Sequence, residues 1–310
     1  MKKKVFATLA IAMICNVVGA QPFTLDNEYK RQLKYYPNIE KHISTATNIE
    51  ATENVVYKTI GDTIKLCMDV YMPQNVSKKL TPIVFIHGGG WRSGAKELDT
   101  PMAQNLASTG DFVCVCVDYR LSDVALYPAG LQDVNSALSY IAERADDWHI
   151  DIGRLTLVGS SSGGQMVALL GATNGSEEKY FVGTRPPHIH RVVDIDGVLA
   201  FIHPDSAEGQ DRPGKPSAAT LWFGKPVSEA EELWQEASAV NHVGEQSAHY
   251  VFVNSSYKRF SAGQDEMSKL LKKYNKEVSV FKTTDTPHTF WLFKPWAPIV
   301  ENVIRTECAR

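Results

Sequence analysis

The stretch Leu157-Val-Gly-Ser-Ser-Ser-Gly-Gly164 decides the fold, because it joins a short apolar run to the start of a helical pattern. A nucleophilic serine at such a junction needs a sharp, strained turn. Glycines two residues before and two residues after it let the strand and the helix approach without Cβ clashes. Gly159 and Gly163 stand at these places around Ser161, so we expect Ser161 to be the nucleophile. Ser162 lacks the first glycine of this spacing and ranks below it. The alternative is a serine cluster that only caps the helix.

Apolar runs and amphipathic stretches alternate on both sides of this turn. Continuous apolar runs are typical of strands buried on both faces, and they occur at 83–86, 112–117, 155–158, 192–195 and 250–253. Strands that alternate with helices indicate βαβ units. The sequence therefore predicts an α/β fold with a mostly parallel central sheet and helices on both faces. Two further strands, 55–59 and 65–71, should pair antiparallel at one edge, because a tight turn joins them.

The stretch 197–247 breaks this alternation, and 207–218 within it is rich in glycine, proline and charge. We interpret 201–247 as a lid-like insertion after the sixth predicted strand, lying over the carboxyl ends of the strands. The rest of 21–310 is expected to form one domain with it.

The first 20 residues predict a secretory signal peptide. Three lysines precede the apolar run 5–15, and small residues end at Ala20. This run is too short to span a bilayer, and no later segment is apolar enough to do so. We therefore expect cleavage after Ala20 and export to the periplasm or beyond, without a membrane anchor.

Composition excludes several classes of protein. The chain has 310 residues, of which 44% are hydrophobic, and its formal charge is −3. This is ordinary globular composition, and the near-neutral charge leaves no electrostatic footprint for nucleic acid. The cysteines that would remain in the exported chain are expected to be unpaired, and no spacing typical of a zinc site occurs; these are Cys67, Cys114, Cys116 and Cys308. The sequence implies no metal and no cofactor, and it leaves the oligomeric state open.

A glycine run follows the predicted strand 83–86, in the sequence His87-Gly-Gly-Gly-Trp91. Acyl transfer passes through a tetrahedral oxyanion that needs converging N–H donors. We expect the N–H groups of Gly89, Gly90 and Ser162 to form this oxyanion hole. His87 could act as a base, but a structural role in the loop is favoured.

A histidine follows the last predicted strand, 278–282, in the sequence Thr286-Pro-His288. A base must accept the serine proton and pass it to the leaving group, and histidine titrates in the suitable range. His288 is therefore the expected base.

Together these motifs resemble the α/β-hydrolase superfamily. The similarity is greatest to its HGGG-type esterase and lipase branch, with hormone-sensitive-lipase-like, feruloyl-esterase-like and polysaccharide-associated bacterial enzymes. It covers about residues 50–305, and its motifs are His87-Gly-Gly-Gly-Trp91, Asp118-Tyr-Arg-Leu121, Tyr127-Pro-Ala129, Gly159-x-Ser-x-Gly163 and Pro287-His288.

The acid departs from the family pattern. The resemblance implies an aspartate a few residues beyond the penultimate strand, but that loop has no carboxylate before Asp265. Asp285 competes with it, three residues before His288. Asp265 is slightly favoured. A third possibility is that neither of these two residues is the acid. Asp194 and Asp196 are expected to hold loops.

These expectations describe a secreted serine esterase. Its substrate would be a carbohydrate-linked ester, such as an acetyl or hydroxycinnamoyl group on plant polysaccharide. Trp91 and Trp291 would contribute to a substrate-binding rim, although aromatic residues at such places also pack in cores. A secreted peptidase of the same fold and an esterase of lipids or small esters are the alternatives.

Overall fold

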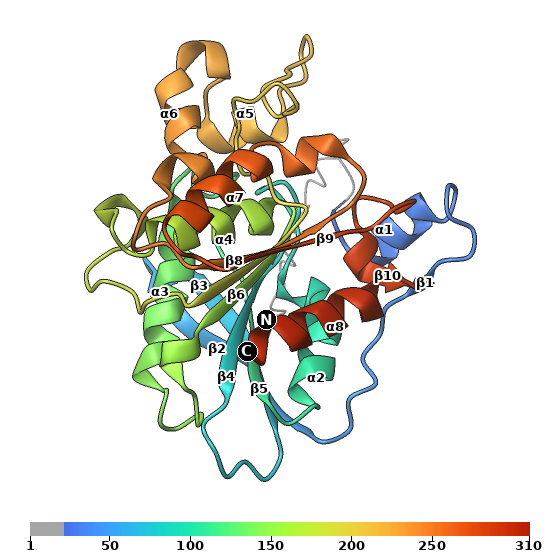
Figure 1. Cartoon of the computed structure of the whole chain (residues 1–310), viewed down its shortest axis with the longest axis vertical. Coiled ribbons are helices and arrows are strands. Elements are labelled where there is room, and N and C mark those ends of the chain that lie inside the picture. The colour runs from blue at the N-terminus through green and yellow to red at the C-terminus, as the bar shows by residue number, and fades with distance from the viewer. Residues whose placement is uncertain (1–21) are drawn as a thin grey trace, which may run out of the picture.

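The computed structural model describes residues 22–310 (Figure 1). Its helices and strands are, in chain order, α1 (Leu25–Gln32), β1 (Glu40–Lys41), β2 (Ile49–Ile60), β3 (Ile64–Pro73), β4 (Thr81–Ile86), α2 (Thr100–Ala107), β5 (Phe112–Val117), α3 (Ala129–Glu143), β6 (Thr156–Ser160), α4 (Ser162–Thr173), β7 (Arg191–Ile195), α5 (Ala218–Phe223), α6 (Glu231–Glu236), β8 (His249–Asn254), α7 (Gln264–Lys273), β9 (Val278–Lys282), β10 (Phe293–Lys294) and α8 (Ala297–Cys308). The predicted signal peptide lies outside the described residues.

One eight-stranded sheet forms the centre of the molecule, in the order β2-β3-β5-β4-β6-β7-β8-β9. Every neighbouring pair from β5 to β9 is parallel. The long hairpin of β2 and β3 is antiparallel and forms one edge. The predicted mostly parallel sheet and its antiparallel edge are therefore confirmed.

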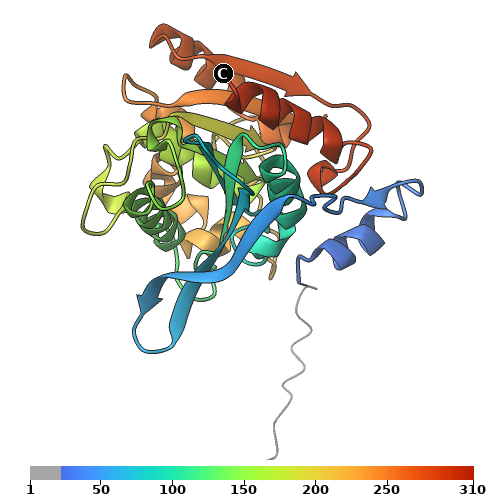
Figure 2. The ribbon, with the colours of Figure 1, turned by 90° about the horizontal axis from the view of Figure 1, so that it is seen from below.

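Helices cover both faces of this sheet, because its central strands are apolar on both sides. In β4, Val84 and Ile86 pack into the core beneath α3 and α4, whereas Ile83 and Phe85 pack into the core beneath α2 and α8. Successive side chains of a strand point to opposite faces, so a continuous apolar run fills both layers. The two layers lie on either side of the sheet in Figures 1 and 2.

The chain between β7 and β8 holds α5 and α6, which lie above the sheet at the top of Figure 1. This is the place predicted for the insertion. Its aromatic residues are buried in a cluster that continues the main core, and they are Phe201, Trp222, Phe223 and Trp234. The insertion is therefore packed onto the body of the domain and does not stand apart from it.

The N-terminal segment is joined to the C-terminal one, although they are far apart in sequence (Figure 2). Strand β1 pairs antiparallel with β10. Tyr29 of α1 packs against Phe293, and Tyr36 meets Trp296 edge to face. This places α1 beside the chain that follows His288.

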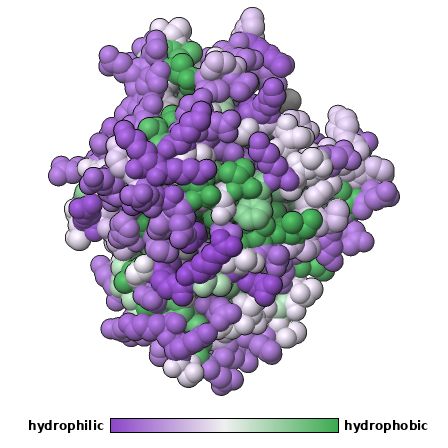
Figure 3. Space-filling view, in the orientation of Figure 1, coloured by the Kyte–Doolittle hydropathy of each residue, from purple (hydrophilic) through white to green (hydrophobic). Residues whose placement is uncertain are grey.

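The surface is mostly hydrophilic on the face that Figure 3 shows. Its apolar side chains gather across the middle, over the edge strand β9 and helix α8, where Val280 and Ile299 are exposed. In residues 22–310 no helix is both long enough and apolar enough to cross a bilayer. Within the same range, the four cysteines are free thiols.

The loop after β4 is organised around His87, which is buried. Its Nδ1 lies 2.8 Å from the carbonyl oxygen of Gly88, and its ring stacks on Tyr119 at 4.5 Å. The Tyr119 hydroxyl donates to the carbonyl oxygen of His87 at 3.0 Å. Burial lowers the pKa of His87 to about 4, so the ring is neutral near pH 7. His87 supports the glycine loop, as the sequence analysis favoured.

This buried histidine makes the protein sensitive to acid. Because the folded pKa lies below the usual value of about 6.5, the unfolded chain binds the extra proton, and stability falls as the pH drops from about 6.5 towards 4. Between about pH 7.5 and about pH 5 we expect His87 to cost about 2 kcal/mol of unfolding free energy. Urea unfolding of wild type and His87→Asn at the two pH values measures this contribution. An equal pH dependence in both proteins would refute it.

Candidate active site

Ser161 stands between the end of β6 and the start of α4, in the turn that the sequence predicted. Its backbone has φ 53° and ψ −118°, which is strained for a residue with a side chain. The glycines allow this turn. A Cβ on Gly163 would lie 2.0 Å from the carbonyl oxygen of Ile86, and one on Gly159 would lie 2.3 Å from that of Gly163. Helix α4 therefore lies too close to β6 and to the end of β4 for a side chain at either position.

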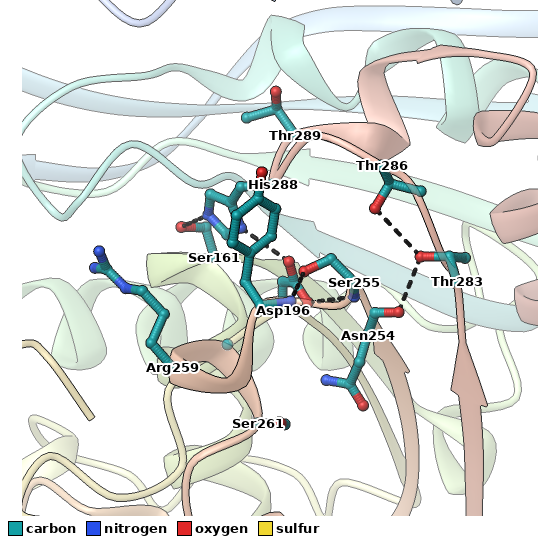
Figure 4. Close-up of polar contacts among 12 residues, drawn as sticks. Ser161, Asp196, Asn254, Ser255, Arg259, Ser261, Thr283, Thr286, His288 and Thr289 are labelled. Carbon is teal, nitrogen blue, oxygen red and sulfur yellow. Dashed lines mark hydrogen bonds and ion pairs between the residues drawn. The ribbon is translucent and has the colours of Figure 1, made fainter. Parts of the chain in front are cut away.

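His288 reaches Ser161 from the loop that follows β9. Its Nε2 lies 2.8 Å from the Oγ of Ser161 (Figure 4). The start of this loop is tied to the end of β8, because the backbone N–H and the hydroxyl of Thr283 both donate to the carbonyl oxygen of Asn254. The ring of His288 is thus presented to the serine by neighbouring strands of the sheet.

Asp196 holds the other nitrogen of this ring. Its Oδ2 lies 2.9 Å from the Nδ1 of His288, and its Oδ1 accepts from the backbone N–H of Ser255 at 2.7 Å (Figure 4). The side chain is fully buried. Asp196 directly follows β7 with φ 52°, and its own N–H donates to the carbonyl oxygen of Val253. Both carboxylate oxygens are therefore fixed by the protein.

The prediction that Asp265 or Asp285 orients His288 is wrong. Asp265 is exposed in the first turn of α7, and Asp285 is exposed in the loop before His288. Neither is bonded to the imidazole, whose Nδ1 faces Asp196. The reason is topological, because β7 is the direct neighbour of β6 and β8 lies one strand further away.

A sequence signal for Asp196 existed. It stands immediately after a buried strand, at the carboxyl edge of a parallel sheet, where sites of α/β proteins form. Asp194, two residues earlier, does hold the loop as expected, because its Oδ1 accepts from the backbone N–H of Gly197 at 2.8 Å. Burial raises the pKa of Asp194 to about 8, so it is largely neutral near pH 7. Asp196 is therefore the carboxylate placed to interact with His288.

Aromatic rings fix the imidazole from two sides. Phe260 stacks on His288 with 3.6 Å between ring centroids and 8° between planes. Trp291 meets it edge to face at 5.3 Å. Arg259 lies over the ring of Phe260, 4.6 Å from its centroid, and forms an ion pair with Glu208 of the insertion. The ring therefore has little freedom to rotate away from the serine.

The expected substrate rim of Trp91 and Trp291 is wrong, because both side chains are 3% exposed. Trp91 stacks on Trp222 at 4.6 Å, and its Nε1 donates to the Oε1 of Gln165 at 3.2 Å. Trp291 packs beside the histidine. Large rings bury more apolar area than other side chains, and here both serve the core.

Gly89 and Gly90 lie beside Ser161 and His288 on the wall of one cavity. Their φ angles are 131° and 63°, which favour glycine, and a Cβ on Gly89 would lie 1.9 Å from the carbonyl oxygen of Ser93. The backbone N–H groups of Gly89, Gly90 and Ser162 make no hydrogen bond within residues 22–310. These three donors are free for an oxygen of a substrate.

The cavity has a volume of about 640 Å³. Its lining comes from the glycine loop, from Ser161 and His288, and from the N-terminal segment with α1. No cluster of three His, Cys, Asp or Glu side chains in the described part of the chain is arranged to hold a metal ion. The arrangement is that of a nucleophile, a base and an orienting carboxylate beside free N–H donors.

Known proteins share this fold. A carbohydrate esterase from gut microbiota, in truncated form, superimposes with a TM-score of 0.69 at 18% identity and covers 87% of this chain and 100% of its own. Esterase B from Lactobacillus rhamnosis gives a TM-score of 0.69 at 16% identity, with 92% and 91% covered. At these identities the likeness shows the fold alone, which is that of the α/β-hydrolases.

Curated relatives are similar over shorter stretches. The carboxylesterase NlhH of Mycobacterium tuberculosis is 37% identical over 101 residues, which are 33% of this chain and 32% of that protein. The acetyl esterase of Salmonella paratyphi B is 26% identical over 156 residues, which are 50% and 46%. The chain thus spans about a third to a half of these two relatives.

Residues 68–260 match the BD-FAE family. This range is more than half of the chain, and it includes the glycine loop, Ser161 and Asp196. The chain therefore belongs to the BD-FAE family of α/β-hydrolase esterases.

Proposed function

We propose that this protein is a carboxylic ester hydrolase that works through an acyl-enzyme on Ser161. The observation that carries the proposal is the continuous line of hydrogen bonds from Ser161 through His288 to Asp196, beside a cavity with free N–H donors. The family and the named esterases among its relatives support the same class of reaction.

The reaction would begin with attack of the Ser161 Oγ on the ester carbonyl carbon, while the Nε2 of His288 takes the hydroxyl proton. Negative charge develops on the former carbonyl oxygen, where the N–H groups of Gly89, Gly90 and Ser162 can stabilise it. The C–O bond to the alcohol then breaks, and the imidazolium returns its proton to the departing oxygen. Water, activated by the same histidine, attacks the acyl-enzyme and releases the carboxylic acid.

Asp196 would act through His288. The carboxylate holds the N–H on Nδ1, so that Nε2 carries the lone pair towards Ser161, and it stabilises the imidazolium that forms in the transition state. The contacts of Asp196 with Ser255 and Val253 fix this acceptor before the substrate arrives.

The substrate would be an ester linked to carbohydrate, with acetyl or hydroxycinnamoyl as the acyl group. The support is a cavity of about 640 Å³ beside Ser161 and a shared fold with a carbohydrate esterase. Turnover of acetyl, feruloyl and methyl esters by the purified protein tests this assignment. Activity only on peptides would favour a peptidase of the same fold. Activity only on lipid or simple esters would favour an esterase of lipids or small esters.

We also propose export with cleavage after Ala20, from the basic start, the short apolar run and the small residues before Gln21. Mass spectrometry of the exported protein should find Gln21 as the first residue. Retention of Met1 would refute the proposal.

The nucleophile can be tested by covalent labelling. A fluorophosphonate probe should label wild type and Ser162→Ala, but not Ser161→Ala, because only the Ser161 hydroxyl is bonded to His288. Unchanged melting temperatures would show that both variants are folded. Labelling that survives Ser161→Ala would exclude Ser161 as the nucleophile.

The acid can be tested with three matched variants. Asp196→Asn keeps an acceptor for Ser255 but presents an amide to His288, which favours the wrong tautomer. The comparable change in a serine protease costs about 10⁴ in kcat, and we expect a loss of about 10³-fold to 10⁴-fold here. Asp265→Asn and Asp285→Asn should stay within about twofold of wild type, because both side chains are exposed and neither is hydrogen-bonded to the imidazole. Near-normal kcat for Asp196→Asn at an unchanged melting temperature would overturn the assignment.

A further inference from the structure

Part of the lining of the cavity beside Ser161 forms a basic wall. The charged side chains of α1 and the residues just after it that line the cavity are Lys30, Arg31, Lys34 and Glu28. Three of these four are cationic, although the whole chain carries a formal charge of −3. This part of the cavity is therefore positively charged, whereas the whole chain carries a negative formal charge.

Helix α1 is fixed in place by the residue next to the histidine. Glu28 is buried, and it accepts from the hydroxyl of Thr289 at 2.6 Å, from Gln32 at 2.7 Å and from Arg31 at 2.7 Å. The pairing of β1 with β10 and the packing of Tyr29 on Phe293 add to this attachment. The N-terminal helix is therefore a built part of the cavity.

Two of the cations remain available to a ligand. Arg31 forms an ion pair with Glu28, which is the acidic residue on this wall. Lys30 and Lys34 are exposed, and within residues 22–310 neither is within ion-pair distance of a carboxylate. Asp26, one turn before Lys30, is paired with Lys41. Basic residues at the C-terminal end of a helix also interact favourably with the helix dipole. This interaction is an alternative reason for their presence, and it predicts no effect on substrate binding.

We propose that Lys30 and Lys34 select substrates that carry a carboxylate near the ester, with uronic acid esters as the class that fits a carbohydrate esterase. The carboxylate could belong to the alcohol part, as in a uronic acid, or to the acyl part, as in a dicarboxylic acid. This inference rests on the proposed function and names its substrate class.

Three matched esters distinguish these sources. Acetylglucose is neutral, acetylglucuronate carries the charge on the alcohol part, and succinylglucose carries it on the acyl part. The double variant Lys30→Ala/Lys34→Ala should raise KM for one of the charged esters about tenfold, with kcat nearly unchanged, because the lost contacts are present in both ground state and transition state. KM for acetylglucose should change less than about twofold.

A control with the same loss of charge is Lys272→Ala/Lys273→Ala. Both lysines are exposed on α7 and do not line the cavity. This variant should leave all three KM values unchanged. A merely structural role for Lys30 and Lys34 would instead lower the melting temperature and alter the three esters alike.

Two results would overturn the proposal. One is an equal KM for charged and neutral esters in wild type. The other is an equal effect of the lysine substitutions on all three esters. Hydrolysis of none of them would contradict the proposed carbohydrate-linked substrate. The lysines are then judged by calorimetry of ester binding to Ser161→Ala, which lacks the attacking hydroxyl. Preferential binding of a charged ester that is lost in Lys30→Ala/Lys34→Ala supports the proposal, and its absence refutes it.

Discussion

The hydrogen bond between the Asp196 carboxylate and the Nδ1 of His288 is the interaction on which the rest of the site depends. It decides which imidazole nitrogen carries the proton, and hence whether the other nitrogen can accept one from Ser161. The bond is possible because β6 and β7 are neighbours, so that the N–H of Ser161 donates to the carbonyl oxygen of Ile195, directly before Asp196. The central sheet thus places Ser161 and Asp196 by backbone pairing.

Further contacts from other parts of the chain hold His288 in line with Ser161 and Asp196. Phe260 covers one face of the imidazole, and Glu28 ties the N-terminal helix to Thr289. The contact of Glu28 with Thr289 joins residues that are 261 apart in the chain. Preorganised groups of this kind avoid reorganisation at the moment of reaction. The bond of Glu28 to Thr289 also holds α1 at the cavity, which Lys30 and Lys34 line.

The sequence predicted what depends on local pattern, and failed where the answer depends on strand order. The apolar runs specified the parallel strands, and the glycine spacing specified the turn at Ser161, because a Cβ at Gly159 or Gly163 collides with the backbone. The prediction of Asp265 or Asp285 as the acid was wrong because no single segment of the sequence specifies the strand order β6-β7-β8. The prediction that Trp91 and Trp291 form a substrate rim was wrong because the burial of a ring depends on its partners in the fold. These partners are Trp222 for Trp91 and His288 for Trp291. The basic wall of α1 was missed because its closeness to Ser161 follows from pairing with the C-terminal segment.

The central claim is that Asp196 works only through His288, and a kinetic double-mutant cycle tests it most directly. The rate of acylation by one activated ester is measured for wild type, Asp196→Asn, His288→Ala and the double variant. Groups that act as a unit are strongly non-additive. We predict that, once His288 is removed, Asp196→Asn lowers the rate by less than about threefold further. Losses that multiply across the two substitutions would contradict it.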